Sequence, residues 1–259
     1  MSYKAEIPYG CYWSTPFARW QGAFANLHSI QFAAHVARKE LARRAIDPKV
    51  FDHGVLGFSV PQKHAFYGLP WLAGLAGVGQ IGGPTVMQAC ATGVRALLAA
   101  AQEIECGLAS VALSITCDRI SNGPHLYYPN PRGPGGTGVA EDWVMDNFSC
   151  DPLGWHAMVS TAENVASKHG IGTAEQHDIV LRREAQYREA LADDSAFLRR
   201  FMTLAFEVPD PAFRKTVATL AGDEGVNFST PEGLAKLKPV VEGGTVTYVV
   251  TVANIGTTP

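Results

Sequence analysis

The chain has 259 residues, of which 47% are hydrophobic and 17% are charged, and its formal net charge is −3. This balance is typical of an ordinary soluble globular protein and excludes the basic surface by which proteins bind nucleic acid. No apolar run is long enough to span a membrane and the N-terminus has no signal-peptide pattern, so we predict a cytoplasmic protein with no membrane partner.

The cysteines are far apart in the sequence, and none belongs to a Cys-x-x-Cys pair. They are Cys11, Cys90, Cys106, Cys117 and Cys150. An odd number of dispersed cysteines indicates neither a disulfide framework nor a zinc site, so we predict reduced thiols and no metal.

The first part of the chain alternates between short strands and helices. Residues 3–13 have the pattern of an irregular strand, and Ser29 is placed to cap a helix that ends near Ala45. One face of this helix is apolar, and we expect its charged face to be solvated. A buried strand is predicted at 55–58, and glycines limit any helix over 66–79 to a short or irregular one.

The stretch from Pro84 to Cys106 joins a short strand to a long helix, with Cys90 at the junction. Because the helix consists mostly of Ala and Leu, we predict that most of its circumference is buried. Unpaired N–H groups and the positive end of the helix dipole would stabilise a thiolate at Cys90. A buried cysteine that only packs is the alternative, but the small residues on both sides of Cys90 leave space for another group to approach the sulfur.

A further apolar strand is predicted at 110–116, so strands and helices alternate up to this point. Such alternation predicts an α/β fold with a mostly parallel sheet between helices on both faces. Functional sites in these folds gather at the carboxyl ends of the strands, where Cys90 lies.

Four segments together resemble the thiolase family. QACATGVRALLAAAQEI is similar to the family's nucleophile segment, and SITCDRISNGP to its GG-x-ESMSN-x-P turn. STAENVASKHGIGTAEQHDIVLRREAQ and DEGVNFSTPEGLAKLKPVVEGGTVT are similar to two later segments. All four occur in family order between about residues 10 and 247, which makes the resemblance far more specific than any single motif.

The resemblance implies three parts. Residues 1–119 would form the first thiolase α/β core around a buried helix, and 120–244 a loop domain that covers coenzyme A. Residues 245–259 would be an atypical, truncated tail. Within the loop domain, the Pro- and Gly-rich stretch 124–138 is predicted to be loop, and two capping boxes, at Ser160 and Thr173, predict helices that are separated by Gly170.

The resemblance also implies ligands. His156 and Met158 stand nearest to a family His-Met pair beside the pantetheine, although WHAM has one extra residue between them. Arg182 and Arg183 are candidates for the phosphates, and a solvated helix face is the alternative. Coenzyme A thioesters are expected as substrates, with no permanently bound cofactor.

The implied function is acyl transfer between an acyl-CoA and coenzyme A or acetyl-CoA through a thioester on Cys90. The chain ends in YVVTVANIGTTP, and the family's second half, with its His-containing and second Cys-containing loops, has no counterpart. We therefore expect a truncated and impaired enzyme. The alternatives are a non-catalytic half-thiolase that acts as an interaction subunit, covered by a partner subunit or a second copy, and a stand-alone cysteine hydrolase.

Overall fold

The computed structural model describes residues 4–247, and the chain divides into two compact units. The first unit contains residues 1–15, 24–122 and 201–221, and the second contains residues 16–23, 123–200 and 222–259. Residues 201–221, which lie inside the predicted 120–244 loop domain, thus group with the first unit. The predicted limits at 119 and 244 stay a prediction.

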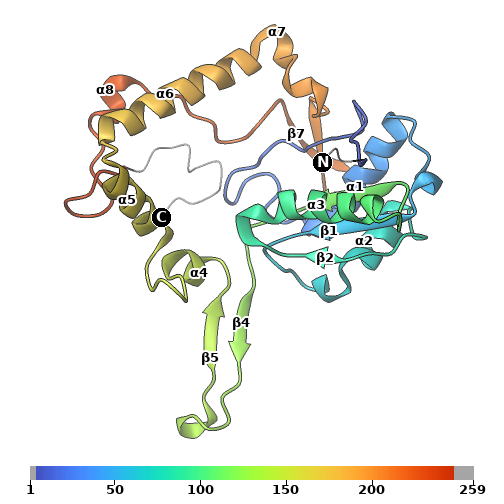
Figure 1. Cartoon of the computed structure of the whole chain (residues 1–259), viewed down its shortest axis with the longest axis horizontal. Helices are drawn as coiled ribbons and strands as arrows, with labels where there is room; N and C mark the ends of the chain where they lie inside the picture. The colour runs from blue at the N-terminus through green and yellow to red at the C-terminus, as the bar shows by residue number, and fades with distance from the viewer. Residues whose placement is uncertain (1–3, 248–259) are drawn as a thin grey trace. The chain divides into compact units, whose positions relative to one another are not determined.

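A three-stranded parallel sheet forms the centre of the first unit (Figure 1). Its strands are β1 (His53–Gly57), β2 (Thr85–Val86) and β3 (Ala112–Thr116), in the order β2-β1-β3. Strand β1 pairs with all five residues of β3, and with β2 through its last two residues. Because β1 is central, four of its five residues are buried, which matches the apolar sequence of this strand.

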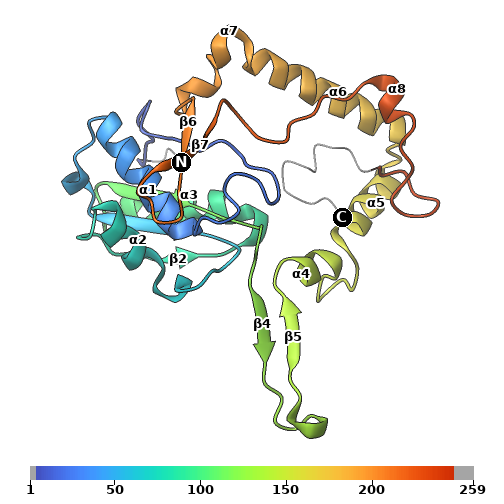
Figure 2. The same cartoon turned by 180° about the vertical axis from the view of Figure 1, so that it is seen from behind.

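Helices cover both faces of this sheet. Helices α1 (Ser29–Arg43) and α2 (Gly68–Ala76) lie on one face, which faces the viewer in Figure 2, and α3 (Thr92–Glu105) lies on the other. The larger core cluster joins α1, α2 and the strands. Helix α3 contributes the buried Ala96 and Ala100 to a small cluster with Val55, and its partly buried Ala99 packs against that cluster. The predicted α/β architecture is therefore confirmed. Helix α2 is short, with nine residues, as the glycines in its sequence predicted.

Two details of α1 differ from the prediction. Ser29 is the first helical residue rather than the cap, and its N–H donates to Gln62 Oε1 at 2.7 Å. Glu40 is buried rather than solvated, because its carboxylate accepts hydrogen bonds from Arg43, Arg44 and the Thr203 hydroxyl. A carboxylate with this many charged and polar partners is stable in a buried position.

An antiparallel hairpin belongs to the same unit. It consists of β6 (Phe206–Pro209) and β7 (Thr216–Leu220). The Phe206 ring packs edge-on against Phe24 and Phe32, with ring centroids 5.8 and 6.0 Å away. These aromatic contacts join the hairpin to the α1 region.

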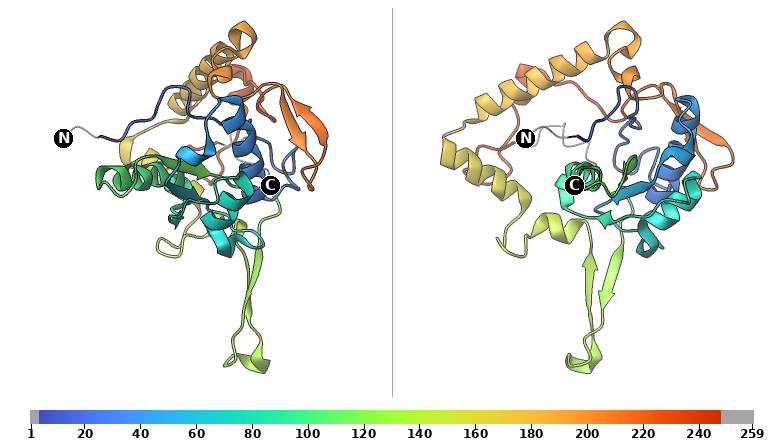
Figure 3. Two further views of the ribbon diagram at one scale, coloured as in Figure 1. Left: turned by 90° about the vertical axis from the view of Figure 1, so that its right-hand side faces the viewer. Right: turned by 45° about the vertical axis from the view of Figure 1, so that its right-hand side comes forward.

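The second unit contains a second hairpin where the sequence predicted only loop. Strands β4 (His125–Tyr128) and β5 (Val139–Asp142) pair antiparallel and form a two-stranded ribbon (Figure 3). The loop prediction of 124–138 was wrong only at its start, where β4 lies, because β5 begins after Gly138. The Pro and Gly residues occupy the connection between the strands and leave the strands themselves free of both.

Helices make up the rest of the second unit. They are α4 (Met145–Ser149), α5 (Met158–His169), α6 (Thr173–Ala190), α7 (Ala192–Ser195) and α8 (Pro231–Leu234). Short 3-10 turns among residues 4–247 of both units occur at Pro48–Val50, Ala65–Tyr67, Ala89–Ala91, Pro134–Gly136 and Leu198–Arg200. Within residues 4–247, no helix combines the length and the apolar character that a membrane span requires.

Gly170 ends α5 in the left-handed conformation, as predicted, but both predicted capping boxes were wrong. Helix α5 begins two residues before Ser160, and α6 is capped by Glu175, whose Oε2 accepts the Gly172 N–H at 3.1 Å. Glu163, the expected partner of Ser160, instead accepts the backbone N–H groups of Thr245 and Val246. The sequence pattern thus correctly identified the Glu163 carboxylate as a hydrogen-bond acceptor near the start of this helix, but it paired Glu163 with Ser160 instead of with Thr245 and Val246.

Other carboxylates join distant segments of this unit in the same way. Glu184 is buried and accepts both the N–H and the hydroxyl of Ser229 at 2.7 Å. Asp223 accepts the Phe17 N–H and the Tyr187 hydroxyl, and burial together with this bond to Asp223 raises the pKa of Tyr187. The second unit is thus assembled from three chain segments through hydrogen bonds from backbone N–H and hydroxyl groups to carboxylates.

Gly57 is required by close packing. A Cβ at this position would lie 2.7 Å from Thr92 Cγ2 and 3.0 Å from Thr116 Cγ2. We expect Gly57→Ala to destabilise the protein by about 1–3 kcal/mol, because the added methyl group overpacks the interface between β1 and α3.

Denaturant unfolding measures this loss, with Gly74→Ala as the matched control. Gly74 lies inside α2 and a Cβ there has no atom within 4 Å, so this substitution should stabilise the helix by about 0.5–1 kcal/mol. Equal midpoints for the two variants would show that Gly57 is not a packing requirement.

The Glu163 contact should make the attachment of residues 245–246 sensitive to acid. Hydrogen bonds from Thr245 and Val246 hold the pKa of Glu163 below its ordinary value of 4.5. A depressed folded-state pKa means that the stabilisation is complete above about pH 4.5 and is lost as the pH falls through the folded pKa. We expect Glu163→Gln to exchange the amide hydrogens of residues 240–247 faster than the parent at neutral pH.

The amide exchange rates of the parent and of Glu163→Gln should become equal at acid pH, where Glu163 is protonated in the parent. Glu232→Gln is the control, since Glu232 is exposed and lies in α8, outside residues 240–247. A difference between parent and Glu163→Gln that persists unchanged at acid pH would contradict this account.

Candidate active site

Cys90 lies at the carboxyl end of the parallel sheet. The chain leaves β2, makes the 3-10 turn Ala89–Ala91 and enters α3 at Thr92. The thiol is exposed, so it is accessible to a reagent or a substrate. The structure thus places Cys90 at the strand-to-helix junction that the sequence indicated.

The first turn of α3 supplies positive potential at this position. The N–H groups of a helix's first turn have no partners within the helix, and the dipoles of the 14 residues in α3 add along its axis. A negative charge on the sulfur, or on an oxygen bonded to an attacked carbonyl carbon, would be stabilised there.

The turn that carries Cys90 has an unusual backbone. Ala89 adopts a left-handed conformation, with φ of 44°, which costs a residue with a Cβ roughly 1 kcal/mol. The Thr92 hydroxyl bridges this turn, because it accepts the Gln88 N–H at 2.8 Å and donates to the Ala89 carbonyl at 2.7 Å. Thr92 is only 5% exposed, so its hydroxyl is fixed by packing.

A second hydroxyl approaches the same carbonyl. Ser59 Oγ lies 3.2 Å from the Ala89 oxygen and 2.8 Å from Asp118 Oδ2. Asp118 also accepts the N–H groups of Ser59 and Val60. The segments that follow β1, β2 and β3 are therefore joined beside Cys90.

The sequence analysis did not identify Thr92, Ser59 or Asp118 as residues that shape the site. Thr92 and Asp118 lie inside quoted motifs, so their motif positions were a usable signal. Ser59 is in neither motif, and nothing in its sequence context distinguishes it.

Cys117, which precedes Asp118, has a different environment from Cys90. Its side chain packs against the main core, and desolvation, with a smaller contribution from the charge of Asp118, raises the pKa of this thiol to about 12. Cys117 therefore stays protonated at neutral pH and is a poor nucleophile.

The prediction that α3 is buried over most of its circumference was wrong. Only Thr92, Ala96 and Ala100 are buried, whereas Val94, Leu97 and Leu98 are 73%, 50% and 38% exposed. The sheet covers one side of the helix, and within the described residues of the first unit no segment buries the opposite side. An apolar helix sequence indicates that the helix packs against another surface, but it does not identify the segment or the chain that provides this surface.

The predicted coenzyme A residues lie in the second unit. His156 precedes α5, and its ring Nδ1 is 3.1 Å from the carbonyl oxygen of Ala157. Met158 is the first residue of α5 and is half exposed.

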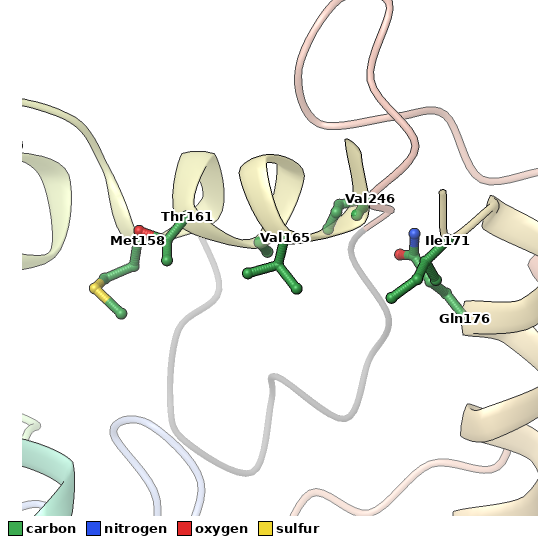
Figure 4. A pocket seen from close by; sticks show the side chains of 8 residues that line it. Met158, Thr161, Val165, Ile171, Gln176 and Val246 are labelled. Carbon is green, nitrogen blue, oxygen red and sulfur yellow. The ribbon is translucent and has the colours of Figure 1, made fainter. Parts of the chain in front are cut away.

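Met158 borders an apolar groove with a volume of about 440 Å³. Figure 4 shows Met158, Thr161 and Val165 projecting from α5 toward this space, with Ile171 and Gln176 at its other end. The lining is completed by Ala162, Ala166 and Val246. The groove has the volume and the chemistry to hold an apolar chain.

Arg182 and Arg183 lie farther along α6 and are exposed. Arg183 Nη1 donates to Gln186 Oε1 at 3.1 Å. Arg182 is six positions beyond Gln176, which corresponds to about 9 Å of helix rise from the end of the groove.

No group of three or more His, Cys, Asp or Glu side chains in the described part of the chain is arranged to bind a metal ion.

Comparison with protein families gives a match over most of the chain. The family described as Thiolase, N-terminal domain, matches residues 13–252. The acetyl-CoA acetyltransferase of Paracoccus denitrificans is 27% identical over 246 residues, which cover 82% of this chain and 61% of that protein. The acetyl-CoA acetyltransferase of Escherichia coli K12 is 28% identical over 245 residues, with coverage of 90% and 59%.

Solved structures give the same result. Human mitochondrial 3-ketoacyl-CoA thiolase superposes with a TM-score of 0.76 at 25% identity and covers 90% of this chain and 59% of its own. The Bacillus anthracis acetyl-CoA acetyltransferase has a TM-score of 0.76, also at 25% identity, with coverage of 90% and 58%. This chain spans about three fifths of the length of these relatives. With its α/β sheet, its strand-to-helix cysteine and this match, the chain belongs to the thiolase family and corresponds to the family's N-terminal part.

Proposed function

We propose that the chain carries out acyl transfer between coenzyme A thioesters, with Cys90 as the acyl acceptor. The observation that supports this most strongly is the exposed Cys90 thiol at the N-terminal end of α3, in a turn fixed by Thr92. The acetyl-CoA acetyltransferases of similar sequence agree with this substrate class.

The proposed reaction has two half-reactions. The Cys90 thiolate attacks the carbonyl carbon of an acyl-CoA, and the carbonyl oxygen becomes an oxyanion that the Cys90 N–H and the α3 dipole stabilise. The oxyanion then collapses, the bond to the coenzyme A sulfur breaks, and the released thiolate takes a proton from solvent. In the second half-reaction, coenzyme A thiolate, or the enolate that acetyl-CoA forms when it loses an α-proton to a base from solvent, attacks the carbonyl carbon of the Cys90 thioester. The bond to the Cys90 sulfur breaks, Cys90 leaves as the thiolate, and the acyl group stays on the attacking group.

The proposal includes a role for the second unit. The groove at Met158 would receive an apolar part of the substrate, with His156 beside it and Arg182 and Arg183 near the phosphates. The region 120–244 would act as the cover over coenzyme A. No permanently bound cofactor is needed for this chemistry, and a cytoplasmic location fits its substrates.

We also propose that turnover by this chain is slow. In the described part of the chain, none of the residues that hold the Cys90 turn is a histidine, and a missing general base typically costs about 10²–10⁴ in rate. The chain would then accept an acyl group faster than it passes the group on.

A second candidate function is that of an interaction subunit, which the exposed apolar side of α3 favours. Val94, Leu97 and Leu98 occupy one side of this helix and are at least 38% exposed. Apolar residues gathered on one element are typical of protein–protein contact sites. A second chain would cover this side in a homo-oligomer or in a complex with a partner subunit.

Acylation of Cys90 tests the first function. We expect intact-mass spectrometry to detect one acyl group after incubation with acetyl-CoA or a longer 3-oxoacyl-CoA, and peptide mapping to place it on Cys90. The Cys90→Ala variant should lose the adduct. The Cys106→Ala variant should keep it, because Cys106 is also exposed but lies at the negative C-terminal end of the same helix. Labelling spread evenly over the exposed cysteines would refute a special role for Cys90.

Association through α3 tests the second function. If the α3 side is an interface between copies, Leu97→Lys should weaken self-association by about tenfold or more, because a buried leucine contributes roughly 1.5 kcal/mol or more. Sedimentation velocity over a range of concentrations measures this change. Val50→Lys is the control, since Val50 is 47% exposed in a 3-10 turn outside α3. Equal association of both variants and the parent would argue against this interface.

A further inference from the structure

We propose that Thr92 is a positioning residue for Cys90, and that its hydroxyl, rather than its bulk, holds the thiol at the positive end of α3. This inference rests on the proposed role of Cys90 and specifies how the fold prepares that residue. Thr92 is 5% exposed, so its effect on a substrate is exerted through the turn.

The hydrogen bonds of Thr92 enclose the residue that carries the nucleophile. Its Oγ1 accepts from the Gln88 N–H at 2.8 Å and donates to the Ala89 carbonyl at 2.7 Å. A hydroxyl has one hydrogen to donate and lone pairs to accept with, so both bonds form at the same time. They fix the backbone on the N-terminal side of Cys90, where Ala89 has the left-handed φ of 44°.

The sheet in turn fixes Thr92. The Thr92 methyl group packs closely on Gly57, which has no Cβ. A Cβ at Gly57 would lie 2.7 Å from Thr92 Cγ2 and would clash with it. The methyl group therefore packs on β1 while the hydroxyl faces the turn. Thr92 thus contacts the central strand β1 with its methyl group and the turn that carries Cys90 with its hydroxyl.

Ser59 gives weaker support to the same carbonyl. Its hydroxyl has a single hydrogen, and Asp118 Oδ2 at 2.8 Å competes for it with the Ala89 oxygen at 3.2 Å. The shorter distance and the carboxylate charge favour Asp118 as the acceptor. Thr92 should therefore influence Cys90 more than Ser59 does.

Two substitutions separate the hydroxyl from the bulk. Thr92→Val keeps the volume and removes the hydroxyl, whereas Thr92→Ser keeps the hydroxyl and removes the buried methyl group. The readout is the rate at which iodoacetamide alkylates Cys90 in the purified full chain at neutral pH. Peptide mass spectrometry measures this rate relative to Cys150, an exposed thiol in the second unit.

We expect Thr92→Val to slow the alkylation of Cys90, measured relative to that of Cys150, by about threefold. This is the size of a typical helix-dipole effect on a charge. Thr92→Ser should react as the parent does, and Ser59→Ala should lie between the parent and Thr92→Val. The proposal would be overturned if Cys90 in Thr92→Val were alkylated as fast as in the parent, or faster. It would also be overturned if Cys90 reacted more slowly in Thr92→Ser than in Thr92→Val.

A second set of variants keeps the proposal testable if Thr92→Val does not fold. Gly57→Ala should displace Thr92 and slow the alkylation of Cys90. Combining it with Thr92→Ser and Thr116→Ser should restore the rate, because both methyl groups that lie within 3.0 Å of the new Cβ are then absent. Failure of the triple variant to recover, while Thr116→Ser alone reacts as the parent does, would contradict the proposal. Because iodoacetamide needs no coenzyme A, these rates are independent of whether Cys90 accepts an acyl group from acyl-CoA.

Discussion

The hydrogen bond from the Thr92 hydroxyl to the Ala89 carbonyl, 2.7 Å long, is the contact on which the account of this site depends. It requires β1 to carry no Cβ at Gly57, α3 to begin at Thr92, and the chain after β2 to turn through a left-handed residue. Each of these conditions is local, and together they place Cys90 at the first turn of a helix, where a thiolate is stabilised. The first unit contains all of these residues, so this arrangement does not depend on where the second unit lies.

The second unit is held together by different interactions. Carboxylates of Glu163, Glu184 and Asp223 accept backbone N–H and hydroxyl groups from segments far away in the sequence. Such hydrogen bonds satisfy backbone groups in a region with few buried apolar residues, and they give a structural role to Glu163 in TAENVA and to Asp223 in DEG. The groove beside Met158 lies next to one of these junctions, since Val246 both lines the groove and donates its N–H to Glu163.

The sequence was sufficient to predict the α/β class, the strand-to-helix position of Cys90 and the Gly170 helix end, because each depends on local periodicity or backbone preference. It was insufficient to predict the contacts of Glu163 and Glu40. Their partners, Thr245 and Thr203, are remote in the chain, and residue spacing does not identify such pairs. The exposure of Leu97 is a third kind of case. Its apolar character predicts burial, but burial also depends on a covering surface that local sequence does not specify. Thr92 was counted only among the small residues beside Cys90, because its hydrogen bonds to Gln88 and Ala89 depend on a turn geometry that the sequence does not specify.

The central claim is that Cys90 passes an acyl group to and from coenzyme A. The most direct measurement is isotope exchange, in which the purified chain is incubated with acetyl-CoA and labelled coenzyme A and the label is followed into acetyl-CoA. A Cys90 thioester intermediate predicts exchange without any second acyl substrate, and its loss in Cys90→Ala but not in Cys106→Ala. Exchange that persists in Cys90→Ala, or no exchange by the folded parent, would contradict the account.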